Sequence, residues 1–214
     1  NLVSDCKEKI QVEYVSANPT GPLHVGHGRG AAVGSALANL MKAAGMNVSR
    51  EYYINDAGNQ INNLAASVNA RYLEQLGQTV EFPENGYHGH DIIETAERIV
   101  LIYGDRFLNM SEEERLKEFR TIALKEKLSA LKEDLEAFNV TYDEWFSEQT
   151  LHDANAIKNA CDLLTERGYL YEEGGALWLK ATEYGDDKDR VVIRDNGIPT
   201  YFAADIAYHQ DKYA

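Results

Sequence analysis

Two histidines three positions apart are the residues whose types and spacing best suit chemistry in this chain. His24 and His27 follow a turn stiffened by Pro19 and Pro22, and Gly26 lies between them. Side chains at this spacing lie on the same side of a helical turn, so both imidazoles can donate hydrogen bonds to one phosphate. Fixed donors stabilise the charge that builds on phosphorus during displacement more than they stabilise the bound substrate. The pair therefore predicts phosphate chemistry.

A strand and a helix are predicted on either side of this turn. Residues 11–15 form an apolar run typical of a buried strand, and the run after the turn repeats its apolar residues at helical spacing before Gly45. Those residues are Val33, Leu37, Leu40, Met41 and Ala44. The start of such a helix offers unpaired N–H groups and a positive dipole end to an anion. A lone histidine there would more often be a cap or an exposed polar residue, but a pair after this turn favours the functional interpretation.

Residues 47–54 predict a second parallel strand, which completes a βαβ unit. Asn55, Asp56 and Gln60 follow that strand, where open α/β sheets bind ligands. An ordinary turn with a helix cap explains these three residues equally well. The sequence thus favours a Rossmann-like α/β fold with a parallel nucleotide-binding sheet, covering residues 1–77.

Residues 78–138 predict a helical connecting region that serves as scaffold. Ser111 and Glu114 fit a capping box at the start of its second helix. The run His88-Gly89-His90-Asp91 suggests a metal site, but no third ligand at helical spacing supports it. We therefore predict no protein-bound metal.

The last part of the chain predicts a third strand, a β-rich insertion and a return to the main fold. Residues 139–151 carry the strand and a substrate loop, residues 152–198 the insertion, and residues 199–214 the closing helix. Two hairpins are expected in the insertion: 169–171 with 176–179, and 190–194 with 198–202. A β-rich piece that interrupts an α/β pattern is typical of an inserted subdomain.

Composition limits the partners of this chain. Its 214 residues carry 21 Lys and Arg against 35 Asp and Glu, a formal charge of −14, which repels polyanions at long range. Cys6 and Cys161 lack the spacing of a zinc site or a disulfide framework. With no membrane-length apolar run and no signal peptide, we expect a cytoplasmic protein. Asn1 at the start and a helix without a stop signal at the end suggest a fragment, truncated at the C-terminus.

The segment around the histidines resembles a known signature. Residues 22–27, Pro-Leu-His-Val-Gly-His, resemble the HIGH motif of class I aminoacyl-tRNA synthetases, which share the HUP-type nucleotide-binding fold, with Val in place of Ile. The preceding Ser-Ala-Asn-Pro-Thr-Gly, residues 16–21, is similar to the form found in bacterial arginyl-tRNA synthetases. HIGH-like tetrapeptides also occur in other nucleotidyltransferases, whereas the twelve-residue string is specific.

The same resemblance implies residues for the amino acid. Residues 140–149 resemble the family segment that ends the third strand and supplies a carboxylate to the guanidinium, which here is Glu148. Residues 199–209 resemble the specificity helix, where a Tyr and an Asp four residues apart contact the same group; these are Tyr201 and Asp205. A planar cation with five donors suits carboxylates and an aromatic face, and lysine would leave carboxylates unpaired.

The family activity follows as an expectation. Arginyl-tRNA synthetases use ATP and substrate-associated Mg²⁺ to form arginyl-adenylate, and then charge tRNA(Arg). By resemblance His24 and His27 are catalytic and bind ATP together with Gly26. Ser16 and Asn18 address the amino and carboxylate groups of L-arginine, with Glu13 as a possible contributor. Most tRNA contacts would lie on domains outside these residues.

One departure from the family and two alternatives complete these expectations. No KMSK-like lysine loop occurs in the sequence, so we expect this fragment alone to be inactive. An adenylate-forming nucleotidyltransferase of the same superfold, acting on another small substrate without tRNA, is the first alternative. A non-catalytic binding fragment is the second, and it predicts that both histidines are dispensable.

Overall fold

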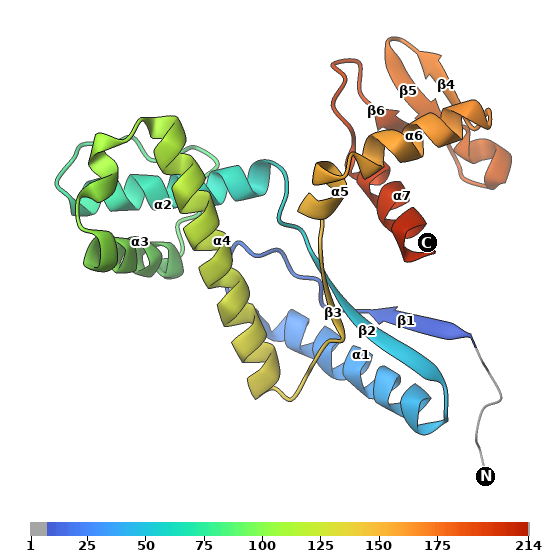
Figure 1. The fold of residues 1–214 in the computed structure, drawn as a ribbon, viewed down its shortest axis with the longest axis horizontal. Helices are drawn as coiled ribbons and strands as arrows, with labels where there is room; N and C mark the ends of the chain where they lie inside the picture. The colour runs from blue at the N-terminus through green and yellow to red at the C-terminus, as the bar shows by residue number, and fades with distance from the viewer. Residues whose placement is uncertain (1–7, 214) are drawn as a thin grey trace. The chain divides into compact units, whose positions relative to one another are not determined.

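The computed structural model describes residues 8–213, which belong to two compact units divided between Phe146 and Ser147. Figure 1 shows the course of the chain through both. The first unit contains the predicted βαβ segment and a helical region. The second contains short helices and an antiparallel sheet.

A βαβ segment opens the first unit. Strand β1 (Lys9–Glu13) leads to helix α1 (Val25–Ala43), and strand β2 (Asn47–Ile54) then pairs with β1 in parallel, with Gln11 opposite Ser49. Strand β3 (Glu144–Ser147) lies on the other side of β2, so the sheet order is β1-β2-β3. The predicted α/β fold with a parallel sheet is confirmed.

The first strand ends earlier than its apolar run predicts. It was expected over residues 11–15, but it stops at Glu13 because Val15 and Ser16 adopt positive φ angles of 68° and 45°. Backbone in that region cannot continue a strand ladder. The apolar pattern therefore ran past the strand into the turn that leads to the histidines.

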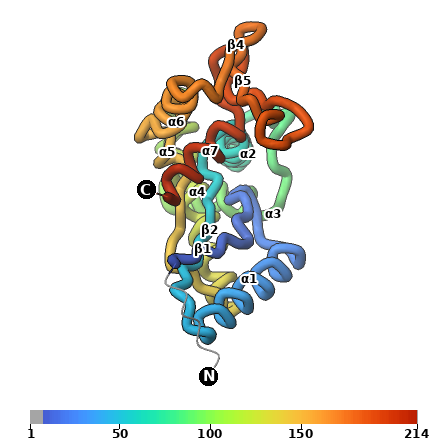
Figure 2. Tube along the Cα trace, turned by 90° about the vertical axis from the view of Figure 1, so that its right-hand side faces the viewer, coloured from blue at the N-terminus to red at the C-terminus, as the bar shows by residue number. Residues whose placement is uncertain are grey.

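Helix α1 approaches the sheet through its small residues. Ala31, Gly34 and Ala38 are buried, whereas Val33, Leu37 and Leu40, which form the apolar stripe predicted from the sequence, are exposed. Gly34 lies so close to the Tyr14 ring that a Cβ atom there would overlap it. Close packing against a large aromatic ring thus selects the small residues for the buried face. Figure 2 shows α1 alongside the strands.

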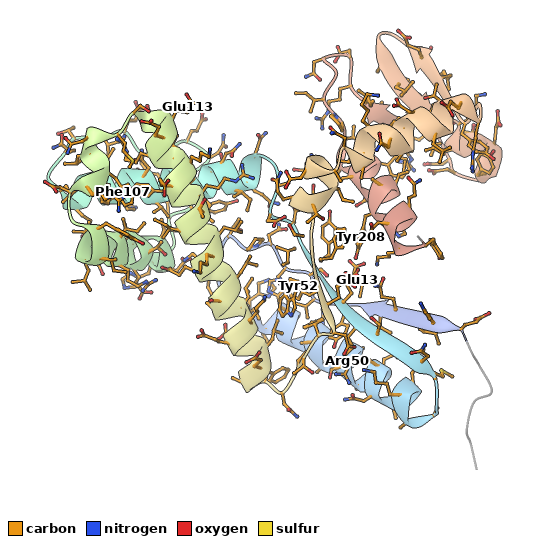
Figure 3. The ribbon with its side chains drawn as sticks, in the orientation of Figure 1. Glu13, Arg50, Tyr52, Phe107, Glu113 and Tyr208 are labelled. Atoms are coloured by element: carbon orange, nitrogen blue, oxygen red, sulfur yellow. The ribbon has the colours of Figure 1, made fainter. Side chains whose placement is uncertain are left out.

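Aromatic side chains dominate the cluster beneath this part of the sheet. The buried members of the cluster come from the turn after β1, from α1 and β2, and from the end of α4 with the segment that follows it: Tyr14, Ala17, Ala31, Tyr52, Ile54, Leu135 and Val140. Tyr52 stacks on Trp145 with ring centroids 4.5 Å apart, and Tyr14 lies 4.7 Å from Tyr142. Tyr52, one of the residues of this cluster, is labelled in Figure 3.

Helices form the rest of the first unit. They are α2 (Asn59–Gln75), α3 (His90–Tyr103), the 3₁₀ turn η1 (Arg106–Asn109) and α4 (Glu112–Ala137). Their core is a second buried cluster: Leu64, Val68, Tyr72, Ile92, Ala96, Ile99, Phe107, Phe119 and Ala123. The capping box at Ser111 and Glu114 is confirmed at the start of α4. Because α4 contributes to both clusters, it ties the helical region to the sheet.

The histidine-rich run before α3 has structural partners. The His88 ring packs 4.4 Å from that of Phe82, and Asp91 Oδ2 lies 2.6 Å from the buried Lys127 Nζ. Between residues 8 and 213 no three His, Cys, Asp or Glu side chains are grouped so that they could hold a metal ion. None of the helices within residues 8–213 combines the length and the apolar character of a membrane span. Cys161 is buried as a free thiol, and Cys6 lies outside the described residues.

The second unit packs helices against a small antiparallel sheet. Helices α5 (Gln149–Asp153) and α6 (Ala156–Glu166) precede strands β4 (Leu170–Glu173) and β5 (Ala176–Leu179), the turn η2 (Ala181–Tyr184), strand β6 (Arg190–Ile193) and helix α7 (Tyr201–Lys212). The β4–β5 hairpin confirms the first predicted one. The second predicted hairpin forms in part: the Arg194 N–H donates to the Ile198 carbonyl at 3.0 Å, the Thr200 N–H donates to the Val192 carbonyl at 2.9 Å, and Ile193 bridges Pro199. Strand β6 also pairs with β5, which was not predicted. Thr200 caps α7, accepting from the Ala203 N–H, so residues 201–202 are helical.

Glycine at position 34 should be required by packing, although alanine is the better helix former. We expect Gly34→Ala to lower the free energy of unfolding by about 1–3 kcal/mol, because the new methyl group displaces the Tyr14 ring. Gly30→Ala is the matched control, because nothing lies within 4 Å of a Cβ there. It should stabilise the chain by up to about 1 kcal/mol through helix propensity. Urea unfolding of the 214-residue chain measures both, and equal effects would contradict the packing.

Candidate active site

The two signature histidines form a reciprocal cap at the start of α1. The backbone N–H of Gly26 donates to His24 Nδ1 at 3.1 Å, and the backbone N–H of His24 donates to His27 Nδ1 at 3.2 Å. Ser or Thr with Glu or Gln usually fills this capping-box role, and here two imidazoles do so. Both histidines therefore cap the helix, as the structural interpretation of a histidine at a helix start predicts.

The cap also fixes the tautomer of each ring. A nitrogen that accepts a hydrogen bond carries no proton, so a neutral imidazole held through Nδ1 carries its proton on Nε2. The rings stack with centroids 3.7 Å apart and an interplanar angle of 20°. The two Nε2–H groups of His24 and His27 are thereby left as donors beside the N-terminus of α1. The cap uses only the Nδ1 atom of each ring.

Burial and the neighbouring ring keep His27 neutral. Desolvation lowers its pKa below the ordinary value of 6.5, and the His24 ring lowers this pKa further. A neutral ring preserves the Nδ1 acceptor on which the cap depends. The neutral His27 ring thus presents an oriented dipole rather than a positive charge.

Glycine at position 26 protects the arrangement of these rings. A Cβ there would lie 2.9 Å from Cε1 of His24, closer than real contacts allow. Any other residue would push the imidazole out of the cap. The expectation that Gly26 binds ATP together with the histidines remains a prediction, and the structure gives this residue a second role.

The turn before the histidines carries Ser16 and Asn18. The Ser16 N–H donates to the Tyr14 carbonyl at 3.0 Å, which closes a tight turn around Val15. The Ser16 hydroxyl oxygen accepts the Tyr53 N–H at 3.1 Å, so its own proton can be donated to a ligand. Asn18 is exposed next to the buried Ala17 and Pro19.

Tyrosines below this turn are functional candidates that sequence reasoning missed. Tyr52 donates its hydroxyl to the Ala17 carbonyl at 3.0 Å, and Tyr142 donates to the Tyr14 carbonyl at 3.2 Å. A signal did exist in the sequence, because a tyrosine on a buried strand needs a partner for its hydroxyl. Which carbonyl would accept it could not be read from the sequence.

The polar residues after β2 fit the turn interpretation. The Gln60 amide donates to the Asn55 carbonyl at 3.3 Å, and an Arg120 N–H donates to the Asp56 carbonyl at 3.2 Å. Backbone carbonyls of the turn thus receive these side chains. A ligand-binding role for the group gains no support from these contacts.

The candidate guanidinium residues lie in the second unit. Glu148 is 5% exposed, directly before α5, and its Oε1 lies 3.5 Å from His152 Nε2. Tyr201 and Asp205 are exposed and one turn apart on α7. Helices α5 and α7 pack against each other. The possible contributor Glu13 is an exposed residue at the end of β1 in the first unit.

A described family and several curated proteins match this chain over nearly its whole length. The family profile described as the catalytic domain of class I tRNA synthetases (R) matches residues 2–214. The arginine–tRNA ligase of Carboxydothermus hydrogenoformans is 59% identical over 206 residues, which cover 96% of this chain and 37% of that protein. The enzyme of Moorella thermoacetica is 57% identical over 205 residues. The chain thus spans little more than a third of the length of these relatives.

Solved structures show the same fold. A crystal structure described as an arginyl-tRNA synthetase from Campylobacter jejuni superposes with a TM-score of 0.88 and 40% identity, covering 99% of this chain and 46% of that one. The Thermus thermophilus arginyl-tRNA synthetase gives a TM-score of 0.66 at 29% identity, over 94% of this chain and 35% of that one.

The cap predicts a specific titration behaviour for His27. NMR of ring nitrogens in the ¹⁵N-labelled chain should show the Nε2–H tautomer for His24 and His27 at neutral pH, and a protonation midpoint below 6.5 for His27. Because its pKa is lowered on folding, the stability from this ring is present above pH 6.5 and is lost as pH falls through the folded-state pKa. In His27→Gln this part of the pH dependence of unfolding should disappear. An Nδ1–H tautomer in either ring would contradict the assignment.

Proposed function

Since this chain belongs to the class I arginyl-tRNA synthetase family as part of its catalytic domain, we propose that the whole enzyme activates L-arginine with ATP and transfers it to tRNA(Arg). The observation that supports this most is the histidine cap, which fixes two Nε2–H donors side by side at a helix N-terminus. Those donors suit a phosphate chain in a displacement at phosphorus.

The activation step needs positioning and charge stabilisation. The carboxylate oxygen of arginine attacks the α-phosphorus of ATP, the bond to the bridging oxygen breaks, and pyrophosphate leaves with the electron pair. The substrate is its own nucleophile, so the protein need not supply a base. His24 and His27 donate to phosphate oxygens as negative charge moves toward the leaving group.

Magnesium in this proposal arrives with the nucleotide. Mg²⁺ keeps several waters and commonly binds through substrate phosphates with one or two carboxylates, rather than in an all-protein cage. The absence of a metal-binding cluster from residues 8–213 is compatible with that mode. Binding of tRNA falls mainly to parts of the enzyme beyond these residues, because the charge of −14 opposes a polyanion.

Recognition of arginine is proposed for three residues of the second unit. Glu148 and Asp205 supply carboxylates to the guanidinium, and Tyr201 supplies an aromatic face. By the family resemblance, Ser16 and Asn18 address the amino and carboxylate groups of the amino acid, and Glu13 is a possible third contributor. The available proton of Ser16 fits a carboxylate acceptor. Lysine, with one compact ammonium, would leave this set partly unpaired.

Replacing each histidine in the full-length enzyme separates capping from catalysis. His24→Asn keeps an oxygen acceptor suited to a helix N-cap but removes the Nε2–H donor. We expect arginine-dependent ATP–pyrophosphate exchange to fall about 10²–10³-fold in kcat, as for loss of a transition-state donor, with little change in thermal stability. His27→Asn should behave similarly in exchange. Wild-type exchange in both stable variants would show that the histidines only cap the helix.

Carboxylate removal tests the arginine site. In the full-length enzyme, Glu148→Gln and Asp205→Asn should each raise the KM for arginine about 10–100-fold, because each loses a charge-assisted hydrogen bond, and should leave the KM for ATP within about twofold. Glu144→Gln and Asp211→Asn are matched controls at exposed positions. Steady-state exchange assays measure both constants. An unchanged KM for arginine in either test variant would remove that residue from the site.

A further inference from the structure

The backbone between β1 and the signature histidines is strained at two neighbouring residues. Val15 has a φ of 68° and Ser16 one of 45°, and neither is a glycine. A hydrogen bond from the Ser16 N–H to the Tyr14 carbonyl closes the turn around Val15. Turns of this kind with a central positive φ are rare and strained, and a β-branched centre adds to the strain. Such a conformation persists only where its surroundings hold it.

Two tyrosine hydroxyls hold the ends of this turn. Tyr142 donates to the Tyr14 carbonyl at 3.2 Å, and Tyr52 donates to the Ala17 carbonyl at 3.0 Å. The Tyr14 carbonyl therefore accepts hydrogen bonds from both the Tyr142 hydroxyl and the Ser16 N–H. The bond from Tyr142 holds in place the acceptor on which the bond from Ser16 depends. We name the two hydroxyls and their two carbonyl acceptors the tyrosine clamp. Its donors come from β2 and from the segment before β3, far away in the sequence.

Tyr52 is buried and Tyr142 is half-buried, and both hydroxyls remain hydrogen-bond donors throughout the physiological pH range. Tyr52 has no exposed surface, and burial raises its pKa to about 12. Burial also raises the pKa of Tyr142, as do the neighbouring phenols of Tyr14 and Tyr52. A phenol that stays protonated always has a hydrogen to donate. The carbonyl of the buried Ala17 would otherwise lose its partner in a poorly solvated place.

We infer that Tyr52 and Tyr142 are positioning residues for the amino-acid side of the activation reaction. They act through the backbone of residues 14–17, which fixes where the Ser16 hydroxyl and the following Asn18 stand. The inference rests on the proposed function, in which those two residues address the amino and carboxylate groups of arginine. It adds a specific role for two hydroxyls that touch no substrate.

Loss of a clamp hydroxyl should weaken the binding of arginine and leave the binding of ATP unchanged. His24 and His27 are held by their own reciprocal cap, so loosening the turn leaves their donors in place. Phenylalanine at either clamp position keeps the aromatic packing, including the Tyr52 stack on Trp145, and removes only the hydroxyl. If the tyrosines served packing alone, phenylalanine would be a neutral substitute apart from stability.

The test is a set of Tyr→Phe variants in the full-length enzyme. Tyr52→Phe and Tyr142→Phe should each raise the KM for arginine about tenfold, because losing one bond lowers the population of the binding-competent turn. The KM for ATP should change less than about twofold. Tyr72→Phe is the matched control: that buried hydroxyl donates to the Gly104 carbonyl at 2.9 Å in the helical region. The Tyr72→Phe variant should lose a similar amount of thermal stability and keep the wild-type KM values for arginine and ATP.

Relieving the strain provides a second test. Glycine adopts a φ near 68° without penalty, so Val15→Gly should make the turn less dependent on the clamp. In the double variant with Tyr52→Phe, the KM for arginine should lie well below that of Tyr52→Phe alone. A merely structural role for Tyr52 would give additive losses instead.

The outcomes separate this inference from the proposed function. Absence of arginine-dependent ATP–pyrophosphate exchange from the wild-type enzyme in the presence of tRNA(Arg) would reject the proposed function itself. With wild-type exchange present, an unchanged KM for arginine in both clamp variants would overturn the inference, as would equal changes in Tyr72→Phe. Additivity with Val15→Gly would also overturn it. A selective rise in the KM for arginine, rescued by Val15→Gly, supports it.

Discussion

The structure depends on holding one strained turn between a strand and a helix. Residues 14–17 must leave β1 abruptly, because Val15 and Ser16 adopt backbone angles that a strand cannot continue. The hydrogen bonds that oppose this strain come from β2 and from the segment ahead of β3. The turn at the start of a local signature of twelve residues is thus held by hydrogen bonds from residues distant in the sequence.

Helix α4 extends that dependence to the helical region. Phe119 and Ala123 lie in the core of the helical bundle, whereas Leu135 lies in the aromatic cluster beneath the sheet. The helix leads directly into Val140 and Tyr142, so its position sets where the second clamp hydroxyl stands. A region that the sequence marks as scaffold is in this sense part of the support for the turn.

Sequence reasoning succeeded where the determinants were local, and it failed where they were not. The histidine turn, the strand at 47–54 and the Ser111–Glu114 capping box follow from neighbouring residues, and the structure contains each. The buried face of α1 could not be predicted, because packing on Tyr14 selects small residues over the apolar stripe. The hairpin predicted over 190–194 and 198–202 is shortened at its end, because Thr200 caps α7 and residues 201–202 enter that helix instead of pairing. The tyrosine clamp could not be predicted from the sequence, because backbone carbonyls accept its hydrogen bonds.

A crystal structure of the full-length protein with L-arginine and a non-hydrolysable ATP analogue tests the central claim most directly. We predict the phosphate chain within hydrogen-bonding distance, about 2.7–3.2 Å, of Nε2 in both signature histidines, with the amino-acid carboxylate near the Ser16 hydroxyl and the turn at residues 14–17 unchanged. Phosphates bound away from both rings, or a turn that relaxes to ordinary strand geometry around the ligands, would contradict the account.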